Sequence, residues 1–180
     1  CVEEVASLRA GYDPIRIGIG INTGMMLLGT LGEADRMEGS VISDAVNLAA
    51  RLEGLTKLYK TPLLISEATR NKLTPDAFGL RLIDKVAVKG KEDPVLIHEV
   101  LDAEVPEERD GKLATLETFC TGWELYQNQQ FEKAQAQFQA CLEQNPKDSI
   151  AELYVERCKT LLSIGWDPET WEGIIRMDTK

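Results

Sequence analysis

The order of strand-like and helix-like segments changes near residue 103, and this change limits the folds open to the chain. Up to residue 102, segments in which apolar residues alternate with small or polar ones, as in half-buried strands, are interleaved with segments of helical period. From residue 113 onward only the helical period remains. The pattern predicts an α/β or α+β sheet domain over 1–102, followed by an all-α helical tail over 113–180.

The sheet part contains six segments with strand character. The first two flank turn-forming residues at 22–24, so we expect them to pair as a hairpin, with a polar loop to follow at 33–38. A short helix capped by Ser66 is expected after the fourth strand. The strands are expected at 15–22, 25–32, 39–43, 61–66, 80–90 and 94–102.

The helix expected after Ser43 is the most informative element. Ser43 stands at the N-cap position, and Asp44 falls in the first turn, where the helix dipole favours a negative charge. Asn47 and Arg51 lie one turn apart on the flank of the apolar stripe, about 110° and about 70° from its centre. A guanidinium suits phosphate oxygens, and an amide can hold a sugar. From the pattern alone, an ion pair between Arg51 and a surface acid is the simpler interpretation. The stripe consists of Ala45, Leu48, Leu52, Leu55 and Tyr59.

Residues 103–112 are acidic, contain a proline and a glycine and lack a period, so we expect a linker there. The helical tail beyond it has residues at the intervals of a tetratricopeptide repeat, in which a small residue lets two helices approach and an aromatic residue fills the groove. A plain helical hairpin is the alternative. One repeat cannot bury its own apolar face, so the tail must pack on the sheet domain or on missing or partner helices. Two tryptophans near the C-terminus could pin the end of the chain onto these helices. The repeat-like positions are Gly122, Ala134, Phe138 and Pro146.

Charge and cysteine content exclude some classes of function. The net charge is -10, and residues 101–180 carry 16 acidic against 8 basic residues, which argues against nucleic-acid binding. The four cysteines are widely spaced and a single histidine adds no ligand cluster, so we expect reduced thiols and neither zinc nor a disulfide scaffold. No run approaches the roughly 20 apolar residues of a membrane span, and a cytoplasmic location is expected. Residues 1–9 read as a helix without a cap, which suggests that the chain starts inside a longer protein.

Four stretches carry a resemblance to a known family. "IRIGIGINTG" (15–24), "LLGTLG" (27–32), "VISDAVNLAARLE" (41–53) and "VAVKGK" (86–91), in this order and spacing, resemble the C-terminal half of a class III adenylate/guanylate cyclase catalytic domain. The similarity covers about residues 1–101, and "DAVNLAARLE" is its most specific part. It implies an α+β, ferredoxin-like half-domain. A tetratricopeptide-like tail after such a domain resembles an arrangement of bacterial, especially cyanobacterial, cyclases.

The resemblance implies a reaction and a set of site residues. The ribose 3'-hydroxyl of ATP or GTP would attack its own α-phosphate and expel pyrophosphate. Asn47 would orient the ribose, Arg51 would stabilise charge on the α-phosphate, and Lys89 would contact the outgoing phosphates. Ser40 matches the position that reads the purine, and its hydroxyl can accept from the adenine amino group, which favours ATP. Ser43 departs from the glycine of most members, and this would matter if its φ were positive.

The resemblance also implies parts that this chain lacks. Two divalent ions, Mg or Mn, are expected for the full domain, held by two aspartates of the N-terminal half, and no metal ligand is expected here because Asp44 is better explained as a helix-start charge. The sites would form between two catalytic domains of a homodimer, so this fragment alone should be inactive. The alternative hypothesis is a degenerate cyclase-like module with a regulatory or scaffolding role, which binds a protein partner through its helical tail.

Overall fold

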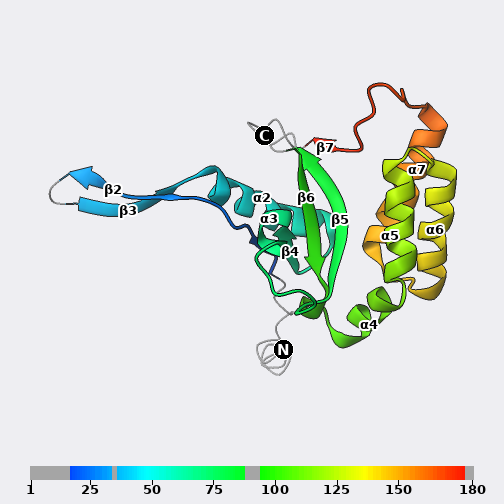
Figure 1. The fold of residues 1–180 in the computed structure, drawn as a ribbon, viewed down its shortest axis with the longest axis horizontal. Coiled ribbons are helices and arrows are strands. Elements are labelled where there is room, and N and C mark those ends of the chain that lie inside the picture. The colour runs from blue at the N-terminus through cyan, green and yellow to red at the C-terminus, as the bar shows by residue number, and fades with distance from the viewer. Residues whose placement is uncertain (1–16, 34–35, 88–93, 177–180) are drawn as a thin grey trace, which may run out of the picture.

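The structure is a computed structural model that describes residues 17–33, 36–87 and 94–176 of the chain. It contains a five-stranded sheet in the order β1-β4-β6-β5-β7 and a separate two-stranded hairpin, β2-β3 (Figure 1). The helix expected at 1–9 lies outside the described residues. The strands are β1 (Ile19–Ile21), β2 (Leu27–Glu33), β3 (Arg36–Ile42), β4 (Leu63–Ser66), β5 (Leu80–Ala87), β6 (Val95–Val100) and β7 (Ile175–Arg176). The helices are α2 (Asp44–Tyr59), α3 (Glu67–Arg70), the short 3-10 helix η1 (Leu101–Ala103), α4 (Pro106–Ala114), α5 (Leu116–Gln127), α6 (Phe131–Gln144) and α7 (Ser149–Ile164).

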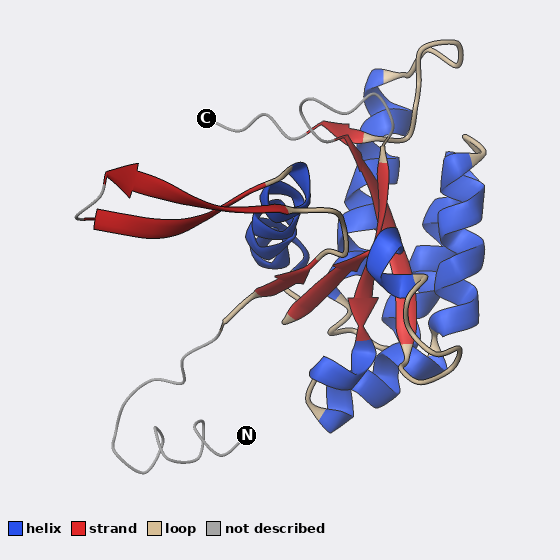
Figure 2. Ribbon diagram, turned by 60° about the vertical axis from the view of Figure 1, so that its left-hand side comes forward, coloured by secondary structure: helices blue, strands red, loops and turns tan. Residues whose placement is uncertain are grey.

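The hairpin predicted between the first two strands is wrong. β1 pairs in parallel with β4, whereas β2 pairs with β3, and the latter begins inside the segment expected as a polar loop. The side chains of the turn explain the difference. The amide of Asn22 donates to the carbonyl of Ala45 at 3.0 Å, and its oxygen accepts from the hydroxyl of Ser66 at 2.6 Å. The turn therefore ties β1 to α2 and β4, and the β2-β3 hairpin extends away from the sheet (Figures 1 and 2).

Gly20 in the middle of β1 allows α2 to lie directly on the strand. A Cβ added at Gly20 would stand 2.3 Å from the backbone nitrogen of Glu53 and 2.4 Å from the carbonyl oxygen of Ala49. The isoleucines that alternate with the glycines are exposed to solvent, Ile19 by 44% and Ile21 by 42%. The buried face of β1 is thus its glycine face, because only a residue without a side chain fits beneath α2.

The three helices α5, α6 and α7, called the helical region below, pack on the same face of the sheet as α2. Gly20 is paired with Leu64, Leu64 with Glu99, and Glu99 with Arg81, so all four residues point to one side. Gly20 meets α2 on that side, and the guanidinium of Arg81 lies 4.0 Å from the ring centre of Phe119 in α5. Of the packing partners left open by the sequence, the sheet is the one observed, and α5, α6 and α7 stand together beside it (Figure 1).

The contacts inside the helical region follow the sequence pattern. A Cβ added at Gly122 would stand 3.0 Å from the ring of Phe138, which is fully buried. The rings of Trp166 and Trp171 pack edge-on against Phe131, with centroids 4.6 and 5.1 Å away. The expected anchoring of the C-terminal tryptophans is confirmed. The likeness to a tetratricopeptide repeat stays a prediction.

The irregular linker predicted at 103–112 is not observed. η1 and α4 occupy most of this segment, with Pro106 at the first position of α4, where its fixed φ suits a helix start. Lys112 is buried, and its ammonium donates to Glu99 at 2.9 Å and to Glu104 at 2.5 Å. The ion pair between Lys112 and Glu99 thus connects this segment to β6. The core runs without a break from α2 through the sheet into α5–α7.

Candidate functional site

The start of α2 is held by its N-cap. The hydroxyl of Ser43 accepts from the backbone nitrogen of Ala45 at 2.9 Å and donates to the carbonyl of Met25 at 2.8 Å. The φ of Ser43 is -168°, which is extended backbone that any residue adopts, so the serine that departs from the resemblance stands here without strain. Asp44 is the first residue of the helix, where the helix dipole favours its negative charge, as predicted.

Asn47 and Arg51 lie on the flank of α2, as predicted. The stripe residues from Leu48 to the end of the helix are buried in the core. Asn47, in contrast, is exposed, and Arg51 is half-buried. Ala45, expected in the stripe, is only partly covered. The two candidate side chains therefore share one accessible border of the helix, one turn apart. Their roles stay predictions.

The other two candidate residues cannot be placed in the same way. Ser40 lies in β3, paired with Gly29 of β2 and four residues before the start of α2, but its side chain is outside the described part. Lys89 lies within 88–93, which is also outside the described residues. The structure brings Asn47 and Arg51 together and does not test whether Ser40 and Lys89 join them.

A buried polar cluster at the C-terminal end of α2 was not foreseen from the sequence. The hydroxyl of Tyr59 donates to Oδ2 of Asp84 at 2.6 Å, and the guanidinium of Arg157 donates to the same oxygen at 2.6 Å. Burial, followed by the charge of Asp84, raises the pKa of Tyr59 well above its usual range. Burial alone would lower the pKa of Arg157, but Asp84 together with Tyr154 and Tyr59 raises that pKa on balance, so the guanidinium stays charged. The only local signal is that Asp84 breaks the alternation of its strand at a bulge between Leu82 and Asp84.

A second buried cluster surrounds Arg81. Its guanidinium donates to Asp148 at 2.5 and 3.0 Å and to Glu99, and none of the three side chains is exposed. Burial would raise the pKa of Asp148, but the charge and hydrogen bonds of Arg81 lower it on balance, so this carboxylate is ionised at neutral pH. Both buried clusters join the sheet to α7.

A model of the family described as "Adenylate and Guanylate cyclase catalytic domain" matches residues 2–101, more than half of the chain. The chain belongs to this cyclase family. The resemblance stated from four sequence motifs is therefore confirmed at the level of the family.

Individual relatives agree with this assignment. The chain is 39% identical over 149 residues to "Adenylate cyclase, terminal-differentiation specific" of Dictyostelium discoideum, a match that covers 82% of this chain and 7% of the relative. Since this match is longer than the cyclase match, part of it lies beyond residue 101. The chain is also 49% identical over 94 residues to "Adenylate cyclase" of Anabaena cylindrica, and this match covers 51% of the chain and 19% of the relative.

Among solved structures, the chain matches the adenylyl cyclase CyaB from P. aeruginosa with 36% identity and a TM-score of 0.46, over 56% of this chain and 50% of that one. It matches the guanylyl cyclase Cya2 with 32% identity and a TM-score of 0.45, over 57% and 51% of the two chains. The chain spans less than a fifth of each of the two curated relatives named above.

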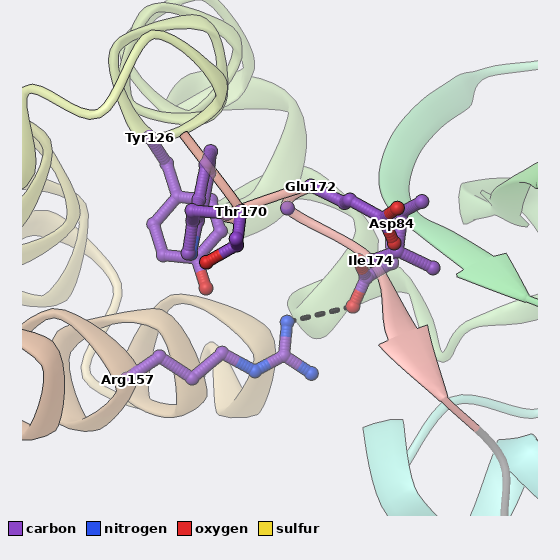
Figure 3. Close-up of a pocket in the computed structure, with 8 residues that line it drawn as sticks. Asp84, Tyr126, Arg157, Thr170, Glu172 and Ile174 are labelled. Atoms are coloured by element: carbon purple, nitrogen blue, oxygen red, sulfur yellow. Dashed lines mark hydrogen bonds and ion pairs between the residues drawn. The ribbon is translucent and has the colours of Figure 1, made fainter. Parts of the chain in front are cut away.

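Two cavities in the described part of this cyclase-family chain lie away from the candidate pair, and neither is lined by Asn47 or Arg51. The smaller, about 200 Å³, lies where Asp84 and Arg157 meet the segment at residues 170–174. Figure 3 shows Arg157 reaching Asp84 from α7 beside the ring of Tyr126. Burial raises the pKa of Tyr126 to about 12, so its hydroxyl stays neutral.

The described part of the cyclase-family chain was also compared with what a metal site or a reactive thiol requires. No three histidine, cysteine, aspartate or glutamate side chains in that part are grouped so that they could hold a metal ion. Cys120, Cys141 and Cys158, the cysteines of the described part, form no disulfide there. Burial raises the pKa of Cys141 to about 11 and that of Cys158 to about 12, which keeps both protonated at neutral pH. No helix in the same part is long and apolar enough to cross a bilayer.

Proposed function

We propose that the chain is part of a nucleotidyl cyclase that converts ATP to 3',5'-cyclic AMP and pyrophosphate in intracellular signalling. The observation that carries the proposal is the pair of Asn47 and Arg51, one turn apart on an accessible border of α2, in a chain that belongs to the cyclase family. The names of the Dictyostelium and Anabaena relatives support ATP as the substrate.

The chemistry assigns each residue of the pair a task. The 3'-hydroxyl of the ribose loses its proton to water and its oxygen forms a bond to the α-phosphorus, while the bond from that phosphorus to the pyrophosphate oxygen breaks. Negative charge grows on the oxygens around the α-phosphorus and on the leaving group. The guanidinium of Arg51 stabilises this charge, and the amide of Asn47 holds the ribose so that the 3'-oxygen is in line.

Arg51 is suited to this task by its place on the helix. It is half-buried on the flank of the stripe, a position from which a long side chain can pack its stem and extend its charged head toward a ligand. A charge held in this way needs little rearrangement when the reaction occurs, which is the condition for electrostatic catalysis.

Two further side chains complete the proposed nucleotide site. Ser40 would accept from the adenine amino group, and Lys89 would contact the outgoing phosphates. Both assignments rest on the motif positions, because the structure describes neither side chain. A cation at Lys89 would lower the barrier by stabilising the pyrophosphate as it leaves.

Within the described residues, no group of side chains fits the divalent ions that the family implies. Two such ions would polarise the α-phosphate and help the 3'-oxygen to ionise. The described residues offer no group of three candidate ligands, and Asp44 is occupied as the first residue of α2. No step is therefore assigned to a metal held by this chain, and we propose that the ligands come from the N-terminal half of the domain, on the second protomer of a homodimer.

Purified full-length protein tests the proposal directly. Incubation with ATP or GTP, each with Mg²⁺ and with Mn²⁺, is expected to release cyclic AMP and pyrophosphate in equal amounts, with ATP the better substrate. Chromatographic identification of both products distinguishes cyclisation from hydrolysis, which would release phosphate or AMP instead. Faster production of cyclic GMP would reverse the assignment of Ser40, and absence of any cyclic nucleotide under all four conditions would overturn the proposal.

A further inference from the structure

The last residue of α2 is held from two sides. Tyr59 is fully buried, and its hydroxyl donates to Asp84 of β5 at 2.6 Å. Its backbone carbonyl accepts from the hydroxyl of Ser149, the first residue of α7, at 2.8 Å. Tyr59 therefore joins the sheet, α2 and the helical region at one point.

The strand is shaped for this junction. The bulge in β5 lies between Leu82 and Asp84, and both Ile83 and Asp84 are buried at it. The carbonyl of Ile83 accepts from the hydroxyl of Tyr154 at 2.7 Å, and Asp84 accepts from Tyr59 and Arg157. One bulge thus receives two bonds from α7 and one from α2.

The two ends of α2 have different anchors. At the N-terminal end, the carbonyls of Met25 and Ala45 bind Ser43 and Asn22, all within the part that matches the cyclase family. At the C-terminal end, the bond from Ser149 comes from outside that part. Among the described residues, the hydrogen bond that the helical region makes to the backbone of α2 is thus at the end at which Tyr59 lies.

Asn47 and Arg51 lie on the same helix as Tyr59, so a movement of the helix at Tyr59 also moves them. Arg51 is eight residues and Asn47 twelve residues before Tyr59, which corresponds to about 12 Å and about 18 Å along the helix axis. A small tilt or rotation at Tyr59 is carried to both side chains by the rigid helix between them. Misplacement of a catalytic group by about 1 Å can cost about 10²-fold in rate.

We propose that Tyr59 is a positioning residue, through which the docked helical region sets the orientation of α2 and hence of Asn47 and Arg51. The inference rests on the proposed function for its effect on catalysis. Its structural part, that Tyr59 and Ser149 hold α2 in place, stands on the contacts alone.

A matched pair of variants of the full-length protein separates positioning from simple stabilisation. Tyr59→Phe and Tyr154→Phe each remove one buried hydroxyl that binds the same bulge and leave the ring in place. The proposal expects Tyr59→Phe to lower kcat by about tenfold or more with a smaller change in KM, since the affected interactions are made in the transition state. Tyr154→Phe should keep kcat near that of the unmodified protein. Equal losses in the two variants would overturn the proposal.

Amide hydrogen exchange provides a readout that does not depend on activity. In Tyr59→Phe, the amides of residues 47–59 should exchange faster than in the unmodified protein, while in Tyr154→Phe they should not. Ser149→Ala leaves the side chain of Tyr59 intact and should give a similar, smaller effect on the same amides. If the full-length protein makes no cyclic nucleotide, the proposed function fails, and the exchange of α2 still decides whether Tyr59 holds it. Unchanged exchange in both Tyr59→Phe and Ser149→Ala would refute the positioning role.

Discussion

The guanidinium of Arg81 donates to both carboxylate oxygens of Asp148, at 2.5 and 3.0 Å, although the two residues are 67 positions apart in the chain. Arg81 belongs to β5 and Asp148 caps α7, and both side chains are fully buried. The sheet and the helical region are therefore joined by a desolvated ion pair. If the helices separated from the sheet, this pair would be broken and its charges would be exposed to water or left unpaired.

Replacing Arg81 should be strongly destabilising. Arg81→Met leaves Asp148 buried without its cation and Glu99 paired with Lys112 alone, and removal of one partner of a buried pair typically costs about 3–5 kcal/mol. The free energy of unfolding, measured in urea, should fall accordingly. Lys147→Ala is the control, because its partner Glu107 and Lys147 itself are largely exposed and their pair should contribute little. Similar urea midpoints for the two variants would argue against the buried cluster.

Replacement by alanine should lower stability at Gly20, which lies at the contact between β1 and α2, and raise it at Gly54, which lies within α2. Gly20→Ala places a Cβ 2.3 Å from the backbone of α2, which cannot move aside without lifting the helix off the strand, so stability should fall. Gly54, inside α2, has nothing within 4 Å of an added Cβ, and Gly54→Ala should stabilise by about 0.5–1 kcal/mol. Thermal unfolding of both variants checks the signs, and a stable Gly20→Ala would contradict the close packing of α2 on β1.

Stability should decline as the pH falls below neutrality because of His98. Burial lowers the pKa of this histidine below its usual value, although its hydrogen bond to Glu67, at 2.5 Å, acts in the other direction. The unfolded chain then binds the proton at a higher pH than the folded one. The contribution of His98 to stability is complete above about pH 6.5 and is lost as the pH falls through the lower folded pKa.

The single histidine of the chain makes this prediction easy to isolate. The free energy of unfolding between pH 8 and pH 5 should fall more steeply for the unmodified protein than for His98→Gln, in which the amide can still donate to Glu67. Parallel pH profiles would show that His98 does not have the lowered pKa.

The sequence predicted the elements that depend on local patterns. α2 with its stripe and cap, the cap of α3 by Ser66 and the strands β4, β5 and β6 all follow from periodicity and turn chemistry. Pairing of the first strands could not be predicted in this way, because Asn22 bonds to groups 23 and 44 residues away. The division of the chain into domains at residues 102 and 113 stays a prediction.

The helix over the expected linker was missed for a different reason. α4 is held by the ammonium of Lys112 and carries little apolar surface, so it has no stripe to detect. Pro106 followed by two glutamates was the available signal, since proline and acidic residues favour the first turn of a helix.

The candidate site could be predicted only in part. The flank positions of Asn47 and Arg51 follow from helix geometry, and the structure agrees. The Tyr59–Asp84–Arg157 cluster could not be foreseen, because its members are 25 and 73 residues apart and meet only after the helices dock on the sheet. Such contacts are a product of tertiary packing rather than of any local pattern.

In the proposed reaction, the guanidinium of Arg51 stabilises charge on the α-phosphate. The most direct test compares cyclic AMP production by the full-length protein with that of Arg51→Ala and of Lys57→Ala, which removes an exposed cation from the same helix. The proposal predicts that kcat falls by about 10² or more in Arg51→Ala at little cost to the thermal midpoint, and that it is nearly unchanged in Lys57→Ala. Equal cyclic AMP production by Arg51→Ala and the unmodified protein would contradict it.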